Sequence, residues 1–116
     1  RPYIMGRIVD VEQFLRLYPC EPEEPGVCFA FDVEDTFLPW NNGRFTVLFQ
    51  QGKTSLVQRR ADFHVKLSIA TLSALLMGYK TAARLHRLGR IEAEPRAIAR
   101  LDNALLQETP YISDYI

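Results

Sequence analysis

Three acidic residues lie close together just before a turn signal in the sequence. Asp32, Glu34 and Asp35 fall within four positions, and carboxylates grouped in this way can hold an ammonium group. The same grouping is also typical of the solvated end of a β-strand, and the side chain of Asp35 is suited to cap a turn. Both interpretations, a binding site for a cation and a structural strand end, stay open from the sequence.

The end of the chain offers a second group that could do chemistry. After Pro110 come two tyrosines, two isoleucines, one serine and one aspartate, a composition more apolar than that of most frayed termini. We therefore expect the tail to pack, either on this domain or on a domain outside this sequence. In the second case the α-carboxylate of Ile116 would reach an active site, where an apolar wall would raise its pKa and make it a stronger base.

The remaining reactive side chains match no familiar motif. His64 and His86 do not share the spacing of a zinc site, and no serine lies in a G-x-S-x-G turn. The sequence also contains no P-loop and no G-x-G-x-x-G segment. We therefore expect no metal ion and no cofactor in this domain.

A predicted β-hairpin positions the three carboxylates. Apolar residues alternate with other residues over 28–33 and again over 45–50, and alternation with a period of two predicts half-buried strands. Between the two runs, the segment 39–43 contains one proline, two asparagines and one glycine, which favours a turn. Trp40 stands at this bend as a large apolar cover whose N–H needs a partner if it is buried.

The rest of the chain predicts an α+β domain. Further short strands are predicted at residues 3–9, 54–59 and 65–67. Helical spacing and capping residues predict helices at residues 10–18, 68–78, 80–88 and from Glu94 onward. Strands followed by helices indicate an antiparallel sheet of about five strands with helices packed on one face.

Size and composition limit the functional classes. The 116 residues, 47% of them hydrophobic, suit one globular domain with a real core. A net charge of zero argues against nucleic acid or an anionic membrane as the main partner. The sequence has no apolar run long enough to span a membrane and no signal peptide. Because Cys20 and Cys28 are too few for a disulfide scaffold, we expect a cytoplasmic protein.

The charges are distributed unevenly along the chain. Eight acidic residues and one basic residue lie between Asp10 and Asp35, whereas six basic and two acidic residues lie between Lys80 and Arg100. Two solvated faces that partly neutralise each other would explain this pattern. An acidic rim that attracts a cationic substrate would explain it as well.

Two segments together resemble a known family. Residues 35–45 read D-T-F-L-P-W-N-N-G-R-F and residues 110–116 read P-Y-I-S-D-Y-I. Both are similar to signature segments of the sterol-carrier-protein-like domain that closes Eis-type (enhanced intracellular survival) acetyltransferases, which are bacterial enzymes of the GNAT superfamily. Looser similarity at residues 5–11 and 75–79 extends the resemblance, in order, over nearly the whole chain.

The resemblance implies that residues 1–116 are a single sterol-carrier-like domain, the C-terminal fragment of a larger acetyltransferase. Such enzymes move an acetyl group from acetyl-CoA to a primary amine, in some members an aminoglycoside or a lysine side chain. This sequence has no R/Q-x-x-G-x-G/A loop, so acetyl-CoA is expected to bind the N-terminal GNAT domains of the parent enzyme. The fragment alone is expected to be inactive.

The resemblance also implies roles for individual residues. In the family the chain's own terminal carboxylate takes the ammonium proton, and that role falls on Ile116, although an aromatic residue is more common at this position. A tyrosine of the missing domains protonates the departing thiolate. Asp114 is expected to orient the amine, and Asp35 and Trp40 are further expected substrate-binding residues. The expected partners are the GNAT domains, a small amine and further copies in a homo-oligomer, with no nucleic acid and no membrane.

An alternative function is a binding module for an apolar ligand. Sterol-carrier-like folds elsewhere hold lipids between sheet and helices, and such a tunnel would be lined by Ile69, Leu72, Leu76 and Met77. Apolar residues at helical spacing are more often packed core. A third possibility is a structural domain that shapes the acceptor cleft without chemistry of its own.

Overall fold

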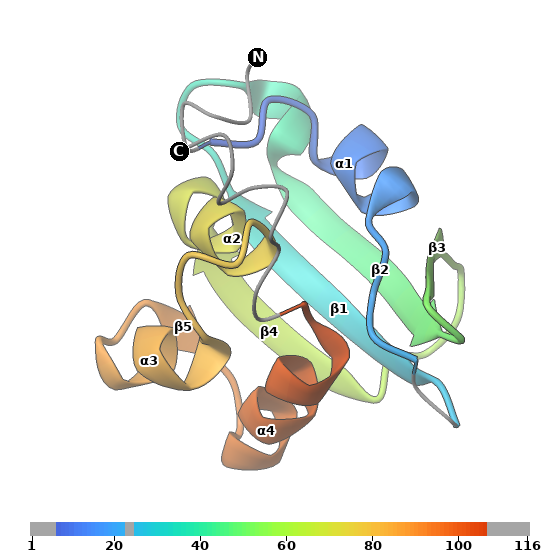
Figure 1. Ribbon diagram of the computed structural model, residues 1–116. Helices are drawn as coiled ribbons and strands as arrows, with labels where there is room; N and C mark the ends of the chain where they lie inside the picture. The colour runs from blue at the N-terminus through green and yellow to red at the C-terminus, as the bar shows by residue number, and fades with distance from the viewer. Residues whose placement is uncertain (1–6, 23–24, 107–116) are drawn as a thin grey trace.

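The structure, a computed structural model, describes residues 7–22 and 25–106. Figure 1 shows a twisted sheet with the α-helices packed in front of it. In chain order the elements are α1 (Val11–Leu17), β1 (Val27–Glu34), the 3₁₀ helix η2 (Pro39–Asn41), β2 (Gly43–Gln50), β3 (Lys53–Leu56), β4 (Phe63–Ser68), α2 (Ile69–Leu76), α3 (Ala82–Arg87), β5 (Ile91–Glu92) and α4 (Pro95–Ala104).

The predicted hairpin forms the middle of the sheet. Strands β1 and β2 pair antiparallel, with Phe29 opposite Val47 and Phe31 opposite Phe45. β3 pairs antiparallel with β2, and β5 pairs antiparallel with β4, which gives the strand order β3-β2-β1-β4-β5. The alternation of apolar residues therefore determines which face of each strand points to the core.

Strand β4 departs from the predicted antiparallel arrangement, because it runs parallel to β1. Leu56 at the end of β3 and Phe63 at the start of β4 lie at the same level of the sheet, on either side of Val47 and Phe29. The connection over residues 57–62 therefore carries the chain sideways across two strands without reversing it. The α+β class with helices on one face is confirmed, but the sheet is mixed.

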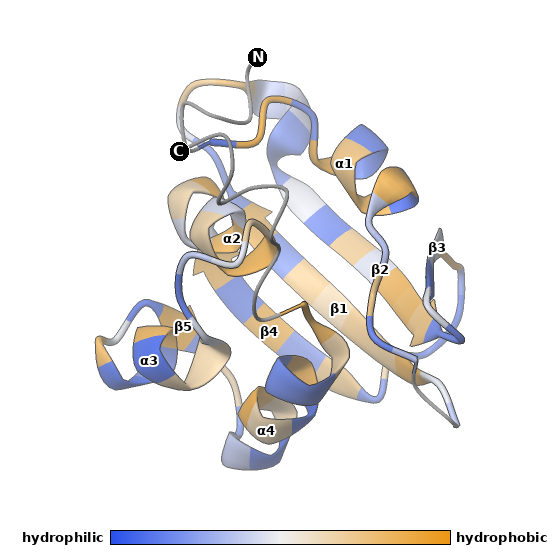
Figure 2. Ribbon diagram, viewed as in Figure 1, coloured by the Kyte–Doolittle hydropathy of each residue, from blue (hydrophilic) through white to orange (hydrophobic). Residues whose placement is uncertain are grey.

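One hydrophobic core lies between the sheet and the helices. Phe29 is at its centre, with its ring centroid 5.9 Å from that of Phe31, 5.9 Å from Phe49 and 5.7 Å from Phe63. Each α-helix adds a buried leucine: Leu15, Leu72, Leu85 and Leu101. Figure 2 shows the alternation along the strands as orange apolar bands between blue ones. Burying each such side chain contributes about 1.5–3 kcal/mol.

Side chains close to the predicted starts cap three of the helices. Oδ1 of Asp10 accepts a hydrogen bond from the backbone N–H of Gln13 at 3.1 Å, as the capping pattern predicts. Ser68 and Thr81 cap α2 and α3 in the same way. Gly89 follows α3 with φ +76°, a left-handed conformation that glycine adopts without strain. These local signals explain why the helix starts agree closely with prediction.

Two details of the sheet differ from expectation. Of the predicted strand 3–9, residues 3–6 lie outside the described part of the chain, and residues 7–9 form no strand. The fifth strand is instead β5, which is too short to show a period in the sequence. His64 is exposed, because it lies on the sheet face that points away from the helices. Within the described ranges, no helix is both long and apolar enough to cross a membrane.

Candidate functional site

Asp35 begins the connection between β1 and β2, residues 35–42, which we call the anchor loop. Its Oδ1 accepts hydrogen bonds from the backbone N–H groups of Phe37 at 2.9 Å and Leu38 at 3.1 Å. Asn42 closes the loop from its other end, because its Oδ1 accepts from the Asp35 N–H at 2.8 Å and its Nδ2 donates to the Asp35 carbonyl at 2.6 Å. Side-chain bonds to nearby backbone thus bend the chain after β1.

The same loop binds the start of the described chain, residues 7–11, which we call the leading segment. Oδ2 of Asp35 accepts hydrogen bonds from Nη2 of Arg7 and from Nδ2 of Asn41, the latter at 2.9 Å. Nδ2 of Asn41 also donates to the Val9 carbonyl at 3.0 Å, and its Oδ1 accepts from the first backbone N–H of α1 at 3.0 Å. The two segments are therefore joined by a continuous polar network.

The carboxylate of Asp35 is fully engaged in this network. The residue is 2% exposed, and each oxygen accepts two hydrogen bonds. Burial alone would raise the pKa of the carboxyl, but hydrogen bonds from Asn41, from the backbone of Phe37 and Leu38 and from Arg7 lower it to about 2. This geometry favours the turn-capping interpretation, since an ammonium ligand would have to displace one of these donors. Substrate binding by Asp35 stays a prediction.

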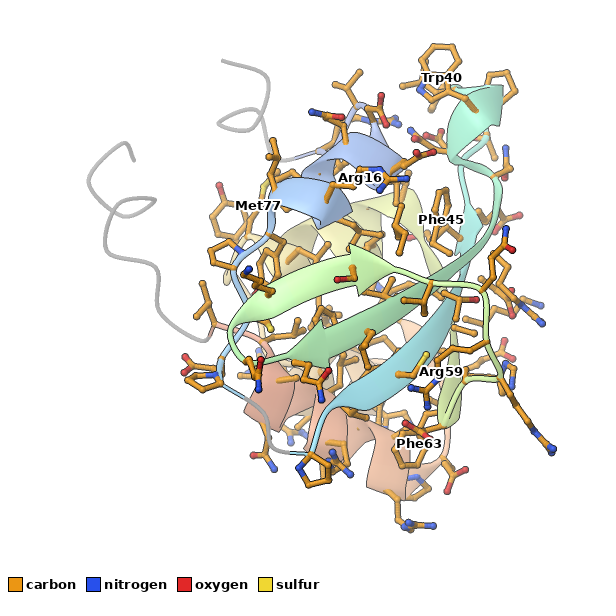
Figure 3. The ribbon with its side chains drawn as sticks, turned by 90° about the vertical axis from the view of Figure 1, so that its right-hand side faces the viewer. Arg16, Trp40, Phe45, Arg59, Phe63 and Met77 are labelled. Carbon is orange, nitrogen blue, oxygen red and sulfur yellow. The ribbon has the colours of Figure 1, made fainter. Side chains whose placement is uncertain are left out.

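Trp40 is held by the leading segment and faces outward. Its Nε1 donates a hydrogen bond to the Val9 carbonyl at 3.0 Å, so the indole N–H has its partner. The residue is nevertheless 60% exposed, and Phe37 in the same loop is 80% exposed. Figure 3 shows Trp40 projecting from η2 at one end of the molecule, away from the sheet. The anchor loop thus presents two aromatic rings outward on a backbone that is fixed from within.

Asp32 and Glu34 are separated from Asp35, because they lie on the sheet face that points away from the helices. There they border a hollow of about 490 Å³. Oδ1 of Asp32 accepts a hydrogen bond from Nε of Arg44 at 2.8 Å, and this pairing lowers the pKa of the Asp32 carboxyl. The hollow contains three acidic and three basic side chains, namely Asp32, Glu34, Glu92, Arg44, Lys66 and Arg90. The formal charges of these six side chains therefore sum to zero.

The predicted catalytic group lies outside the described residues. The α-carboxylate of Ile116, the expected base, and Asp114, the expected amine-orienting residue, both belong to residues 107–116. Their roles stay predictions. By contrast, the residues predicted for a lipid tunnel are described, and Ile69, Leu72, Leu76 and Met77 are all buried members of the one core cluster. Their packing agrees with the packed-core interpretation.

Sequence reasoning missed two parts of the site, Arg7 and the Val9 carbonyl. Arg7 is 28 positions from its partner Asp35, and no periodic pattern links residues so far apart. The role of the Val9 backbone carbonyl cannot be predicted from residue type, because every residue has such a carbonyl. The signal available was indirect: a buried carboxylate needs a cationic or hydrogen-bonding partner.

A family model described as the sterol carrier protein domain matches residues 11–113 of this chain. The chain belongs to the sterol carrier protein domain family. The match covers most of the chain and confirms the resemblance that the anchor loop and the tail motif indicated.

This sterol carrier protein domain is also similar to parts of longer proteins. It is 30% identical to an uncharacterized N-acetyltransferase of Streptomyces avermitilis over 99 residues. These residues make up 84% of this chain and 24% of that protein. Eis1 from Mycobacterium abscessus is 30% identical with a TM-score of 0.69, over 89% of this chain and 25% of Eis1. A probable N-acyltransferase of unknown function from Enterococcus faecalis is 28% identical with a TM-score of 0.80, over 87% of this chain and 26% of that protein. The domain therefore spans about a quarter of the length of these relatives.

Proposed function

We propose that this domain is the C-terminal part of an Eis-type, acetyl-CoA-dependent N-acetyltransferase, with N-terminal GNAT domains preceding it in the same chain. The observation that carries the proposal is the 30% identity to Eis1 over 89% of this chain and 25% of Eis1. On this proposal acetyl-CoA binds the preceding domains, and this domain helps to shape the site for a small primary amine. The parent protein works in the cytoplasm as a homo-oligomer.

The chemistry assigned to this domain is proton removal by the terminal carboxylate of Ile116. That carboxylate takes a proton from the substrate ammonium, and the free amine then attacks the thioester carbonyl of acetyl-CoA. The new C–N bond forms, the C–S bond breaks, and a tyrosine of the preceding domains protonates the thiolate. The extra proton on the attacking nitrogen leaves as the amide forms and restores the tyrosine hydroxyl. An unperturbed α-carboxylate has a pKa of about 3.3–3.7 and is a weak base, so the role requires an apolar, desolvating environment.

Three further residues have supporting roles in this proposal. Asp114, two positions before the carboxylate, orients the amine. Trp40 contributes to the wall of the acceptor site, because its indole ring faces outward from the domain. Asp35 holds the anchor loop that carries Trp40, through its bonds to Arg7 and Asn41.

The test uses the full-length protein and begins with the mass of its C-terminal peptide, since the base role requires Ile116 to be the last residue. Thiol release from acetyl-CoA is then followed with a panel of primary amines. Adding one glycine after Ile116 moves the carboxylate by one residue, and we expect turnover to fall at least about 100-fold with acetyl-CoA binding retained.

The matched control is Ile116→Phe, which keeps the chain length and the position of the terminal carboxylate. We expect this variant to retain turnover within about tenfold, because the base is unchanged. Unchanged turnover in the glycine-extended protein would exclude the base role and leave this domain as a wall of the acceptor cleft. No acetyl transfer by the unaltered full-length protein would refute the proposed activity itself.

A further inference from the structure

Half of the exposed large apolar residues in the described ranges gather where the leading segment meets the anchor loop. Val9, Phe37 and Trp40 belong to these two segments, whereas Leu17, Tyr79 and Leu88 lie on other elements. Single exposed apolar residues are ordinary, but aromatic rings concentrated on one short loop mark a surface that another molecule or domain covers. The Phe37 ring is the most exposed of the six, at 80%.

The backbone beneath these rings is held firmly, as a docking surface requires. Asp35 and Asn42 make four hydrogen bonds that close the loop on itself. Arg7, Trp40 and Asn41 bind the loop to the leading segment. A surface ordered before binding loses little conformational entropy when it docks, and tryptophan is among the residues that contribute most at interfaces.

The position of the surface indicates which partner covers it. Trp40 is bonded through Val9 to the segment that carries the chain into this domain, so any domain preceding Arg7 is tethered a few residues away. A short tether gives a high local concentration, in the millimolar range for flexible linkers, and favours contact with the adjoining domain over contact with a separate molecule. The relatives contain about three quarters of their length outside the matched region, enough for such a domain.

We propose that Phe37 and Trp40 form the docking surface for the domain that precedes Arg7 in the same polypeptide. The proposal rests on the proposed function for the existence of that domain. The ion pair between Arg7 and Asp35 fixes the direction in which the leading segment leaves the anchor loop. The preceding domain meets the rings with an apolar patch of its own, and Trp40 lies where the docked surface borders the acceptor site.

The experiment measures the accessibility of cysteines in the native full-length protein. Phe37→Cys and Trp40→Cys are compared with Leu88→Cys, a matched control at a position 52% exposed on α3. Each variant is treated with a maleimide, and the modified peptides are quantified by mass spectrometry. We expect positions 37 and 40 to react at least about tenfold more slowly than position 88 in the native protein, and at the same rate in urea. Cys20 and Cys28 are buried and report on folding, because they react only if the variant unfolds.

Other outcomes would overturn the proposal. Equal reaction at positions 37 and 88 would show that the anchor loop is open to solvent. Protection that disappears on dilution would assign the surface to a second copy of the chain. Hydroxyl-radical footprinting of the unsubstituted protein gives a second measurement if the variants misfold, with slow oxidation of Phe37 and Trp40 expected relative to Tyr79. None of these measurements detects acetyl transfer, so a failure of this proposal can be distinguished from a failure of the proposed activity.

Discussion

Asp35 and Asp32 lie three residues apart and hold their charges in different ways. Asp32 pairs with Arg44 on the open face of the sheet, where an exposed ion pair adds little to stability. Asp35 is buried, and its four hydrogen bonds replace the water that it has lost. A buried carboxylate is tolerated only with such partners. The network around Asp35 is therefore the more sensitive of the two to substitution.

We expect Asp35→Asn to lower the free energy of unfolding by about 2–4 kcal/mol at pH 7, because an amide nitrogen cannot accept the bonds that Arg7 and Asn41 donate. The pKa of Asp35 is about 2 in the folded protein and about 3.9 in an unfolded chain. Its stabilising effect is therefore complete above about pH 4 and is lost as the pH falls toward 2. Urea unfolding between pH 7 and pH 2 measures both effects.

The control for this prediction is Asp32→Asn, which makes the same substitution in the exposed pair. We expect it to change the free energy of unfolding by less than about 1 kcal/mol. A difference between the Asp35 variant and the unsubstituted protein that stays constant from pH 7 to pH 2 would contradict the assigned role of the carboxylate.

At the scale of elements, α3 shows how one helix completes another. α3 has six residues, too few to form a stable helix in isolation. Asp102 of α4 accepts hydrogen bonds from the first two backbone N–H groups of α3, those of Ala82 at 2.7 Å and Ala83 at 3.0 Å. Thr81 accepts the next, from Arg84 at 3.1 Å. Side chains thus satisfy the N–H groups that a helix start leaves without partners.

We expect Asp102→Asn to lower the free energy of unfolding by about 1–2 kcal/mol, because its amide group offers one acceptor oxygen where the carboxylate offers two. In this variant, hydrogen exchange of the peptide covering residues 82–90 should become faster, and this increase should exceed any increase in the sheet strands. Asn103→Ala, at the exposed neighbouring position of α4, serves as the control, with an expected change within about 0.5 kcal/mol. Equal exchange rates of this peptide in the Asp102→Asn and Asn103→Ala variants would argue against capping of α3 by α4.

At the scale of the whole molecule, the sheet and the helices share one core, and none of the helices in residues 7–22 and 25–106 lies on the other face of the sheet. A row of alternating charge crosses that open face, since Asp32 lies beside Arg44 on β2 and beside Lys66 on β4, which in turn faces Glu92 on β5. Charges in such a row suit contact with water. Stability therefore depends on the helix-covered face, to which all four α-helices contribute.

We expect Leu72→Ala to lower the free energy of unfolding by about 2–5 kcal/mol, because Leu72 is fully buried between α2 and the sheet and its truncation leaves a cavity. Urea unfolding followed by circular dichroism should show a lower midpoint with an unchanged slope. Leu88→Ala, at a half-exposed position, should stay within about 0.5 kcal/mol of the unsubstituted protein. A loss of similar size in both variants would mean that Leu88 also belongs to a buried surface.

Local patterns in the sequence were sufficient for most elements. The hairpin of β1 and β2 follows from alternation with a period of two, and the starts of α1 and α4 follow from Asp10 and Pro95. These signals act between residues a few positions apart, so they can be recognised in the sequence without knowledge of the fold. The direction of β4 could not be predicted from local signals, because it depends on where the connection 57–62 crosses the sheet.

The sequence by itself determined the family, through the anchor loop motif and the tail, and the α+β class, through its periodicity. Only the tertiary structure decided that Asp35 is engaged inside the domain while Trp40 faces outward, although both belong to one motif. The reason is physical: besides the donors in its own loop, Asp35 pairs with Arg7, and Trp40 donates to the Val9 carbonyl, and both of these partners are about 30 positions away. Burial and hydrogen bonding depend on distance in space, and folding alone brings such distant groups together.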